Sequence, residues 1–175
     1  MTRGFYVGRF QPYHKGHHNV IDEISDSLNE LVIGIGSADK SHTRRNPFTA
    51  GERYVMISRA VEELDITTHI VPIEDIDRNA IWVSHVQSLC PPFDIAISNN
   101  PLVIQLFQDT DVEVREGPIF DRSRYQGTRI RELMIQQEKW EHLVPDPTVE
   151  AIHEVGGVTR LRQVVESDDF NGQRE

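Results

Sequence analysis

Short apolar runs separated by amphipathic segments recur through the first two thirds of the chain. The apolar runs have the length of buried strands, and they lie at 4–7, 31–35, 68–73, 93–98 and 112–115. The segments between them repeat apolar residues at helical spacing and predict helices over about 16–29, 49–64, 80–89 and 101–107. Further helices are expected over 128–137 and in pieces beyond residue 147.

Strands that alternate with helices predict a doubly wound α/β fold. Such a chain builds a mainly parallel sheet with helices on both faces. Ligands then bind at the carboxyl ends of the strands, beside the point where the strand order reverses. With 175 residues, the chain is expected to form a single domain, with an α/β core over about 1–145 and a helical tail over 146–175.

Charge and cysteine content narrow the possible functions. The formal net charge of −10 argues against a general binder of nucleic acid or of membrane surfaces, because both attract cationic proteins. No apolar run approaches the about 20 residues that a membrane span needs. Cys90 is the only cysteine, so it forms no intramolecular disulfide. We expect Cys90 to be a buried, inert thiol in a cytoplasmic protein.

The turn after the first predicted strand carries the most specific chemistry. Its sequence, GRFQPYHKGH over 8–17, lies where a strand ends and a helix begins, so its backbone N–H groups can bind an anion. His14 and His17 would share one face of the first helical turn, and Gly16 permits close approach of a ligand. With Arg9, these imidazoles suit a polyphosphate. A pair of unrelated surface histidines, or a zinc site without a recognisable further ligand, remain the alternatives.

Two later turns add positive charge to an otherwise acidic chain. Arg44 and Arg45 follow the second predicted strand and should reach the same edge of the sheet, where they suit phosphate. Thr128 and Arg131 share a face at the start of a predicted helix, and Arg124 precedes them. A hydroxyl and a guanidinium in that position suit a β- or γ-phosphate. Solvated turns with exposed arginines are the alternative at both places.

A candidate acceptor site lies between these turns. Asn79 and Trp82 are three residues apart near a predicted helix start, where they could offer an amide and a stacking surface to a pyridine ring. The alternative for Trp82 is a place in the core, which is the more common environment of a lone tryptophan.

Taken together, these segments resemble one family. The string GRFQPYHKGH is similar to the signature of archaeal-type nicotinamide-nucleotide adenylyltransferases, which belong to the HxGH nucleotidyltransferase superfamily; Tyr13 stands where phenylalanine is usual. Four further strings also resemble family segments: SHTRRNPFTAGER (41–53), DIDRNAIW (75–82), SNNP (98–101) and GTRIREL (127–133). The likeness covers most of 3–145, although Asn99 stands where glycine is common.

The resemblance implies a Rossmann-like fold and transfer of the AMP unit of ATP to nicotinamide mononucleotide, which yields NAD and pyrophosphate. It assigns catalysis to His14, His17, Arg45 and Arg131. The residues that it implies at ATP are Gly8, Arg9, Phe10, His14, Gly16, His17, Arg45, Asn100, Arg124, Thr128 and Arg131. Those that it implies at nicotinamide mononucleotide or NAD are Gln11, Ile76, Asn79 and Trp82.

A phosphate acceptor explains why the sequence shows no obvious catalytic base. The second pKa of a phosphate monoester is about 6, so the attacking oxygen is already ionised near neutral pH. Mg²⁺ is expected on the ATP phosphates with no protein ligand. The resemblance also implies a homo-oligomer, since similar archaeal enzymes are homohexamers. Nicotinic acid mononucleotide, phosphopantetheine or FMN as acceptor stays open, and so does a module that senses NAD or ATP without turnover.

Overall fold

The computed structural model describes residues 1–172, which form one five-stranded parallel sheet. The strands run in the order β3-β2-β1-β4-β5. Their bounds are β1 Arg3–Gly8, β2 Glu30–Ile35, β3 Thr67–Pro72, β4 Ile95–Ile97 and β5 Glu113–Arg115. Because β1 lies between β2 and β4, the strand order reverses beside the carboxyl end of β1.

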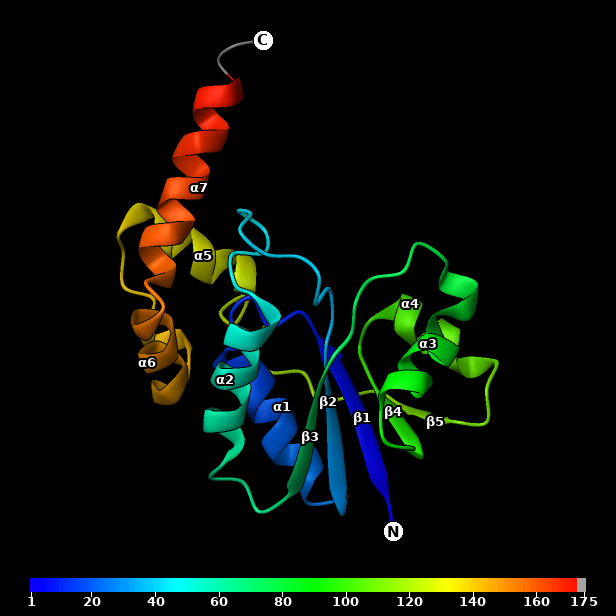
Figure 1. The fold of residues 1–175 in the computed structure, drawn as a ribbon. Coiled ribbons are helices and arrows are strands. Elements are labelled where there is room, and N and C mark those ends of the chain that lie inside the picture. Colours follow the sequence, from blue (N-terminus) through cyan, green and yellow to red (C-terminus); the bar gives the residue numbers. More distant parts are fainter. Residues whose placement is uncertain (173–175) are drawn as a thin grey trace.

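Helices cover both faces of this sheet (Figure 1). Their bounds are α1 Lys15–Ser25, α2 Ala50–Val61, α3 Trp82–Leu89, α4 Pro101–Gln108, α5 Gly127–Gln136, α6 Asp146–Glu154 and α7 Gly157–Gly172. Side chains from α1, α2 and α5 to α7 share one core with one face of the sheet. Those from α3 and α4 share a second core with the opposite face. The predicted doubly wound α/β fold is therefore confirmed.

Neighbouring residues of β1 illustrate this division of the core. The ring of Phe5 stacks on Phe93 in the second core, at 4.7 Å between ring centroids. Tyr6, the next residue, packs against the first core instead, because successive strand side chains point to opposite faces. Cys90 lies in the second core, and burial raises the pKa of its thiol to about 11, as expected of an unreactive thiol.

The predicted boundaries differ from the observed ones where local contacts end an element. The first helix was expected to reach residue 29, but α1 ends at Ser25 because a turn follows, in which the N–H of Ser27 donates to the carbonyl of Ile24. The fourth strand begins at Ile95, two residues late, because Phe93 serves the core before the strand starts. Within residues 1–172, no helix is both long and apolar enough to span a bilayer.

The C-terminal helices pack on the α/β core through α2. A capping box opens α2: the N–H of Glu52 donates to Thr49 Oγ1, and the N–H of Thr49 donates to Glu52 Oε2. The same Glu52 carboxylate accepts two hydrogen bonds from Arg160 of α7, at 2.9 and 2.6 Å. Ile152 of α6 and Leu161 of α7 are fully buried in the first core. The helical tail is thus joined to the start of α2.

Breaking the Glu52–Arg160 pair should destabilise the protein. Both side chains are mostly buried, at 16% and 21% exposure, so Arg160→Leu leaves a carboxylate without its cation. We expect the free energy of unfolding to fall by about 1–3 kcal/mol in urea titrations. Arg59→Leu is the matched control, because its pair with Glu154 is exposed and should contribute less than about 1 kcal/mol. Equal losses in the two variants would contradict this.

Candidate active site

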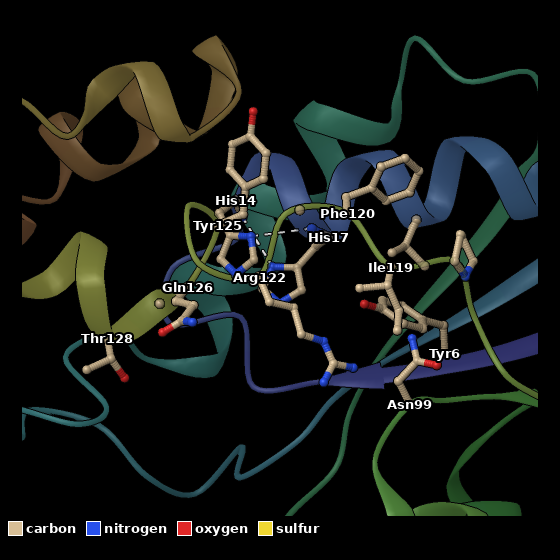
Figure 2. A pocket seen from close by; sticks show the side chains of 14 residues that line it. Tyr6, His14, His17, Asn99, Ile119, Phe120, Arg122, Tyr125, Gln126 and Thr128 are labelled. Atoms are coloured by element: carbon tan, nitrogen blue, oxygen red, sulfur yellow. Dashed lines mark hydrogen bonds between the residues drawn. The ribbon is translucent and has the colours of Figure 1, made fainter.

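Two stacked imidazoles cap the helix that follows β1 (Figure 2). His14 is the N-cap residue of α1, and its Nδ1 accepts a hydrogen bond from the N–H of His17 at 3.3 Å. In return, His17 Nδ1 accepts from the N–H of His14 at 3.2 Å. The rings lie 3.6 Å apart at 21°. The expected shared face is confirmed, and a reciprocal capping box made of two histidines produces it.

This capping arrangement fixes the tautomer of both rings. A neutral imidazole that accepts at Nδ1 carries its proton on Nε2. Burial lowers the pKa of His14 to about 4, and burial together with His14 holds the pKa of His17 well below its usual value. Both rings are therefore neutral at pH 7. They offer two Nε2–H donors to a ligand rather than two positive charges.

The imidazoles line a cavity of about 420 Å³, which we call the imidazole cavity. Its other walls come from the end of β1 and β4 and from the segment 116–128, with Tyr6, Asn99, Arg122, Tyr125 and Thr128 among the lining residues. Gly16 also belongs to this wall. A Cβ at Gly16 would lie 2.8 Å from Tyr125 Cβ and 3.0 Å from the His14 ring, so glycine is needed for the packing of this wall.

A second cavity, of about 400 Å³, gathers arginines from three distant turns. This arginine cavity is lined by Arg9, Arg44, Arg45, Thr128, Arg131 and Glu132. Arg44 pairs with Glu132 at 3.0 Å. Burial first and Arg9 second lower the pKa of Arg131 to about 10, so it stays charged at pH 7. Several cations with one nearby carboxylate make a site suited to a polyanion.

A third cavity, of about 350 Å³, holds the candidate pyridine residues. This tryptophan cavity is lined by Asn79 and Trp82 together with Arg9, Asp75 and Asn100. The Trp82 ring packs edge-on against Phe107 at 5.8 Å, which fixes its plane while it lines the cavity. Trp82 therefore serves the core and the cavity at once.

The three cavities share residues at the carboxyl end of β1. Thr128 lines both the imidazole and the arginine cavities, and Arg9 lines both the arginine and the tryptophan cavities. The three turns that the sequence singled out therefore meet at one edge of the sheet. A ligand with a nucleoside, a polyphosphate and a second ring system could occupy all three cavities together.

Three of the predicted site residues have other tasks in the structure. The Phe10 side chain is 1% exposed and packs on His17 at 4.8 Å, so only its backbone can reach a nucleotide. The Gln11 amide is fully used by Phe48, donating to its carbonyl and accepting from its N–H, both at 2.9 Å. Ile76 does not line the tryptophan cavity. The side chains of Phe10 and Gln11 thus hold the loops of the site in place.

Two residues predicted at ATP do not line the imidazole cavity, whereas a residue beside each of them does. Asn100 caps α4, its Oδ1 accepting from the N–H of Leu102, and lines the tryptophan cavity. Asn99 is the amide in the imidazole cavity. Arg124 lies over the Tyr125 ring, 5.3 Å from its centroid, whereas Arg122 enters the cavity. Sequence spacing cannot tell which neighbour a turn points inward.

Sequence reasoning missed Arg53, which holds the loops of the site in place. Its side chain is completely buried on α2. One guanidinium nitrogen donates to the carbonyls of Arg9 and Gly36, each at 2.8 Å, and the other donates to Ser37 at 3.0 Å. Its Nε donates to Thr49 at 3.2 Å. Arg53 therefore joins the loops after β1 and β2 to the start of α2.

Metal binding by the protein itself has little support in the described part of the chain. Across residues 1–172, no group of three or more histidine, cysteine, aspartate or glutamate side chains is placed to hold a metal ion.

Comparisons with known proteins show the family to which the chain belongs. A family model described as cytidylyltransferase-like matches residues 5–133. Curated relatives named nicotinamide-nucleotide adenylyltransferase are 58% identical over 96% of this chain in Haloarcula marismortui, and 57% identical over 97% in Methanosarcina barkeri. The matches cover 89% and 98% of those proteins. The chain belongs to the nicotinamide-nucleotide adenylyltransferase family.

Solved structures share the fold of this adenylyltransferase family member. A bifunctional NMN adenylyltransferase/ADP ribose pyrophosphatase from Francisella tularensis, complexed with AMP and a manganese ion, matches 97% of the chain with a TM-score of 0.79 and 19% identity. The chain spans 53% of that protein's length. A Plasmodium falciparum nicotinic acid mononucleotide adenylyltransferase matches 90% of this chain and 97% of its own, with a TM-score of 0.60 and 12% identity.

Replacing the buried guanidinium should loosen the loops more than the sheet. Arg53→Lys keeps the charge, but one ammonium cannot reach the carbonyls of Arg9, Ser37 and Thr49 together. We expect the free energy of unfolding to fall by about 2–4 kcal/mol. Hydrogen exchange should accelerate at the amides of residues 9–11 and 36–46, while strand amides stay protected. Arg59→Lys, on the exposed side of the same helix, is the control. Unchanged loop exchange in Arg53→Lys would contradict this role.

The buried neutral imidazoles should make the ligand-free protein sensitive to acid. Because the pKa of His14 is about 4 in the folded state and about 6.5 when unfolded, the unfolded state binds more protons between these values. Stability should therefore fall as the pH drops from 6.5 toward 4, by roughly 2–3 kcal/mol from His14 alone at pH 4.5. His14→Asn keeps a capping acceptor without this titration. Urea titrations at pH 7 and 4.5 should show a smaller loss in the variant; equal losses would refute the assignment.

Proposed function

We propose that this protein transfers the adenylyl group of ATP to nicotinamide mononucleotide, forming NAD and pyrophosphate. The observation that carries the proposal is the meeting of three cavities at the carboxyl end of β1. Curated relatives over half identical to this chain are named for the same activity. In this proposal, ATP occupies the imidazole and arginine cavities and the acceptor occupies the tryptophan cavity.

The chemistry requires charge stabilisation rather than a catalytic base. An ionised phosphate oxygen of the acceptor attacks the α-phosphorus of ATP, and the bond to the β-phosphate oxygen breaks. His14 and His17 would donate their Nε2–H groups to α-phosphate oxygens, where charge grows in the transition state. Arg45 and Arg131 would bind the departing pyrophosphate, with Thr128 beside them.

Arg9, Gly8 and Phe10 would form the part of the site beside the triphosphate. Arg9 lines both the arginine and the tryptophan cavities, so its guanidinium can bridge the phosphates of the two substrates. Gly8 must stay small, because a Cβ there would lie 2.9 Å from the Phe10 ring. Gly8 and Phe10 thereby shape the backbone turn that the triphosphate follows.

The acceptor would place its nicotinamide ring in the tryptophan cavity. Trp82 offers a ring whose plane is fixed by Phe107, and an aromatic ring of this kind stacks on a pyridinium ring. Asn79 lies in the same wall and can hydrogen-bond the carboxamide.

The divalent ion would arrive with ATP as part of the substrate. Mg²⁺ bound to phosphate oxygens reduces the charge of the triphosphate. A solved structure of similar fold was complexed with a manganese ion, which supports the use of a divalent metal. We further propose that the protein is cytoplasmic and forms a homohexamer, and light scattering on the purified protein would test the oligomeric state.

An acceptor panel tests the proposed reaction. The protein is incubated with ATP, Mg²⁺ and one acceptor at a time, namely nicotinamide mononucleotide, nicotinic acid mononucleotide, phosphopantetheine or FMN, and pyrophosphate is measured. We expect the fastest release with nicotinamide mononucleotide, together with NAD. Binding of ATP or NAD without pyrophosphate from any acceptor would instead favour a nucleotide-sensing module.

Loss of one imidazole donor should affect turnover more than ATP binding. In His17→Ala, the transition state loses an N–H donor, and the rate should fall by about 10²–10³. The dissociation constant of ATP should change only a few-fold, because the arginine cavity remains intact. Rapid-quench kinetics and equilibrium ATP binding measure the two quantities separately. An unchanged turnover number would remove His17 from the mechanism.

A further inference from the structure

The imidazole cavity contains little positive charge. Both histidines in it are neutral at pH 7, because burial lowers their pKa values. Among the residues that line this cavity, Arg122 is the one with a permanent charge. A nucleotide phosphate that enters the cavity therefore meets two neutral N–H donors and a single guanidinium.

Arg122 is directed into the cavity from the segment between β5 and α5. Figure 2 shows its guanidinium extending between the imidazoles on one side and Tyr6 and Asn99 on the other. It is close enough for its charge to act on the Tyr6 hydroxyl, whose pKa is nevertheless raised to about 12 by burial. Among the side chains that the structure describes, those of residues 1–168, none forms an ion pair with Arg122. Its charge is therefore available to a ligand.

Arg124 is close in sequence but has a different environment. Its guanidinium lies over the Tyr125 ring, and it lines none of the three cavities described above. Both arginines are exposed on the same segment. The difference between them is one of direction. Arg129, an exposed arginine of α5 that lines none of these cavities either, is the matched control.

We propose that Arg122 is a catalytic residue whose guanidinium binds non-bridging oxygens of the α-phosphate of ATP. This inference rests on the proposed adenylyl transfer. As the acceptor oxygen forms its bond to the α-phosphorus, the bond from that phosphorus to the β-phosphate oxygen breaks and its electron pair leaves with pyrophosphate. Negative charge on the α-phosphate would be held between Arg122 and the two Nε2–H donors, with no proton transfer required.

Arg122 and the residues of the arginine cavity would bind different phosphates of ATP. Thr128 joins the imidazole cavity to the arginine cavity, where the pyrophosphate would leave. Arg122 does not line the arginine cavity. Loss of Arg122 should therefore slow the chemical step while the β- and γ-phosphates stay bound.

The test compares Arg122→Gln with Arg129→Gln in the 175-residue protein, using single-turnover NAD formation and equilibrium ATP binding. We expect a rate loss of about 10²–10³ in Arg122→Gln, with ATP affinity changed only a few-fold. Arg129→Gln should stay within about threefold of the wild type. Arg122→Lys, which keeps the charge without the forked donors, should fall between them. Unchanged melting temperatures would show that both variants fold.

Three outcomes would overturn the proposal. Equal effects in the two glutamine variants would mean that only the general charge of this region matters. A rise in the ATP dissociation constant without a rate loss would place the guanidinium on the adenosine. A wild-type rate in Arg122→Gln would remove the residue from the reaction while leaving the proposed function intact. A wild-type protein that forms no NAD would instead overturn the proposed function and this inference with it.

Discussion

The buried guanidinium of Arg53 is the contact on which the geometry of the site depends. A permanent charge is costly to bury, and Arg53 meets this cost with backbone carbonyls from the loops after β1 and β2 and from the start of α2. Its donors are held in a planar fork, so the carbonyls that they bind are held in fixed relative positions. The loop that carries Arg9 is thereby set against the loop that leads to Arg45.

The site divides its work between neutral donors and permanent charges. The stacked imidazoles are rigid because each caps the other's backbone, and burial keeps them uncharged. The arginines from three separate turns line a second cavity, which shares Thr128 with the imidazole cavity. Such an arrangement does not change its charge across the physiological pH range, so the ionisation of the substrates governs the response to pH in that range.

Hydrophobic periodicity predicted the doubly wound parallel sheet and its helices. Turn chemistry predicted the meeting of three turns, because strand ends in a parallel sheet share one edge. Which residue of a turn lines which cavity depends on the path of the chain, which the sequence pattern does not show. Asn99 and Asn100 enter different cavities, as consecutive residues after a strand often do. Arg53 reads as an ordinary charged position of an amphipathic helix, and only its complete burial reveals its role. The role of Gln11 likewise depends on Phe48, a partner that is distant in sequence and visible only in the structure.

Glu52 links α7 to the start of α2, beside the candidate active site. Glu52 closes the first turn of α2 and binds Arg160 of α7, and the next residue along is Arg53. The first turn of α2 therefore carries both the residue that binds α7 and the residue that holds the loops after β1 and β2. Displacement of α7 would strain that turn and, through Arg53, the loops after β1 and β2. The described side chains of α7 themselves line none of the three cavities.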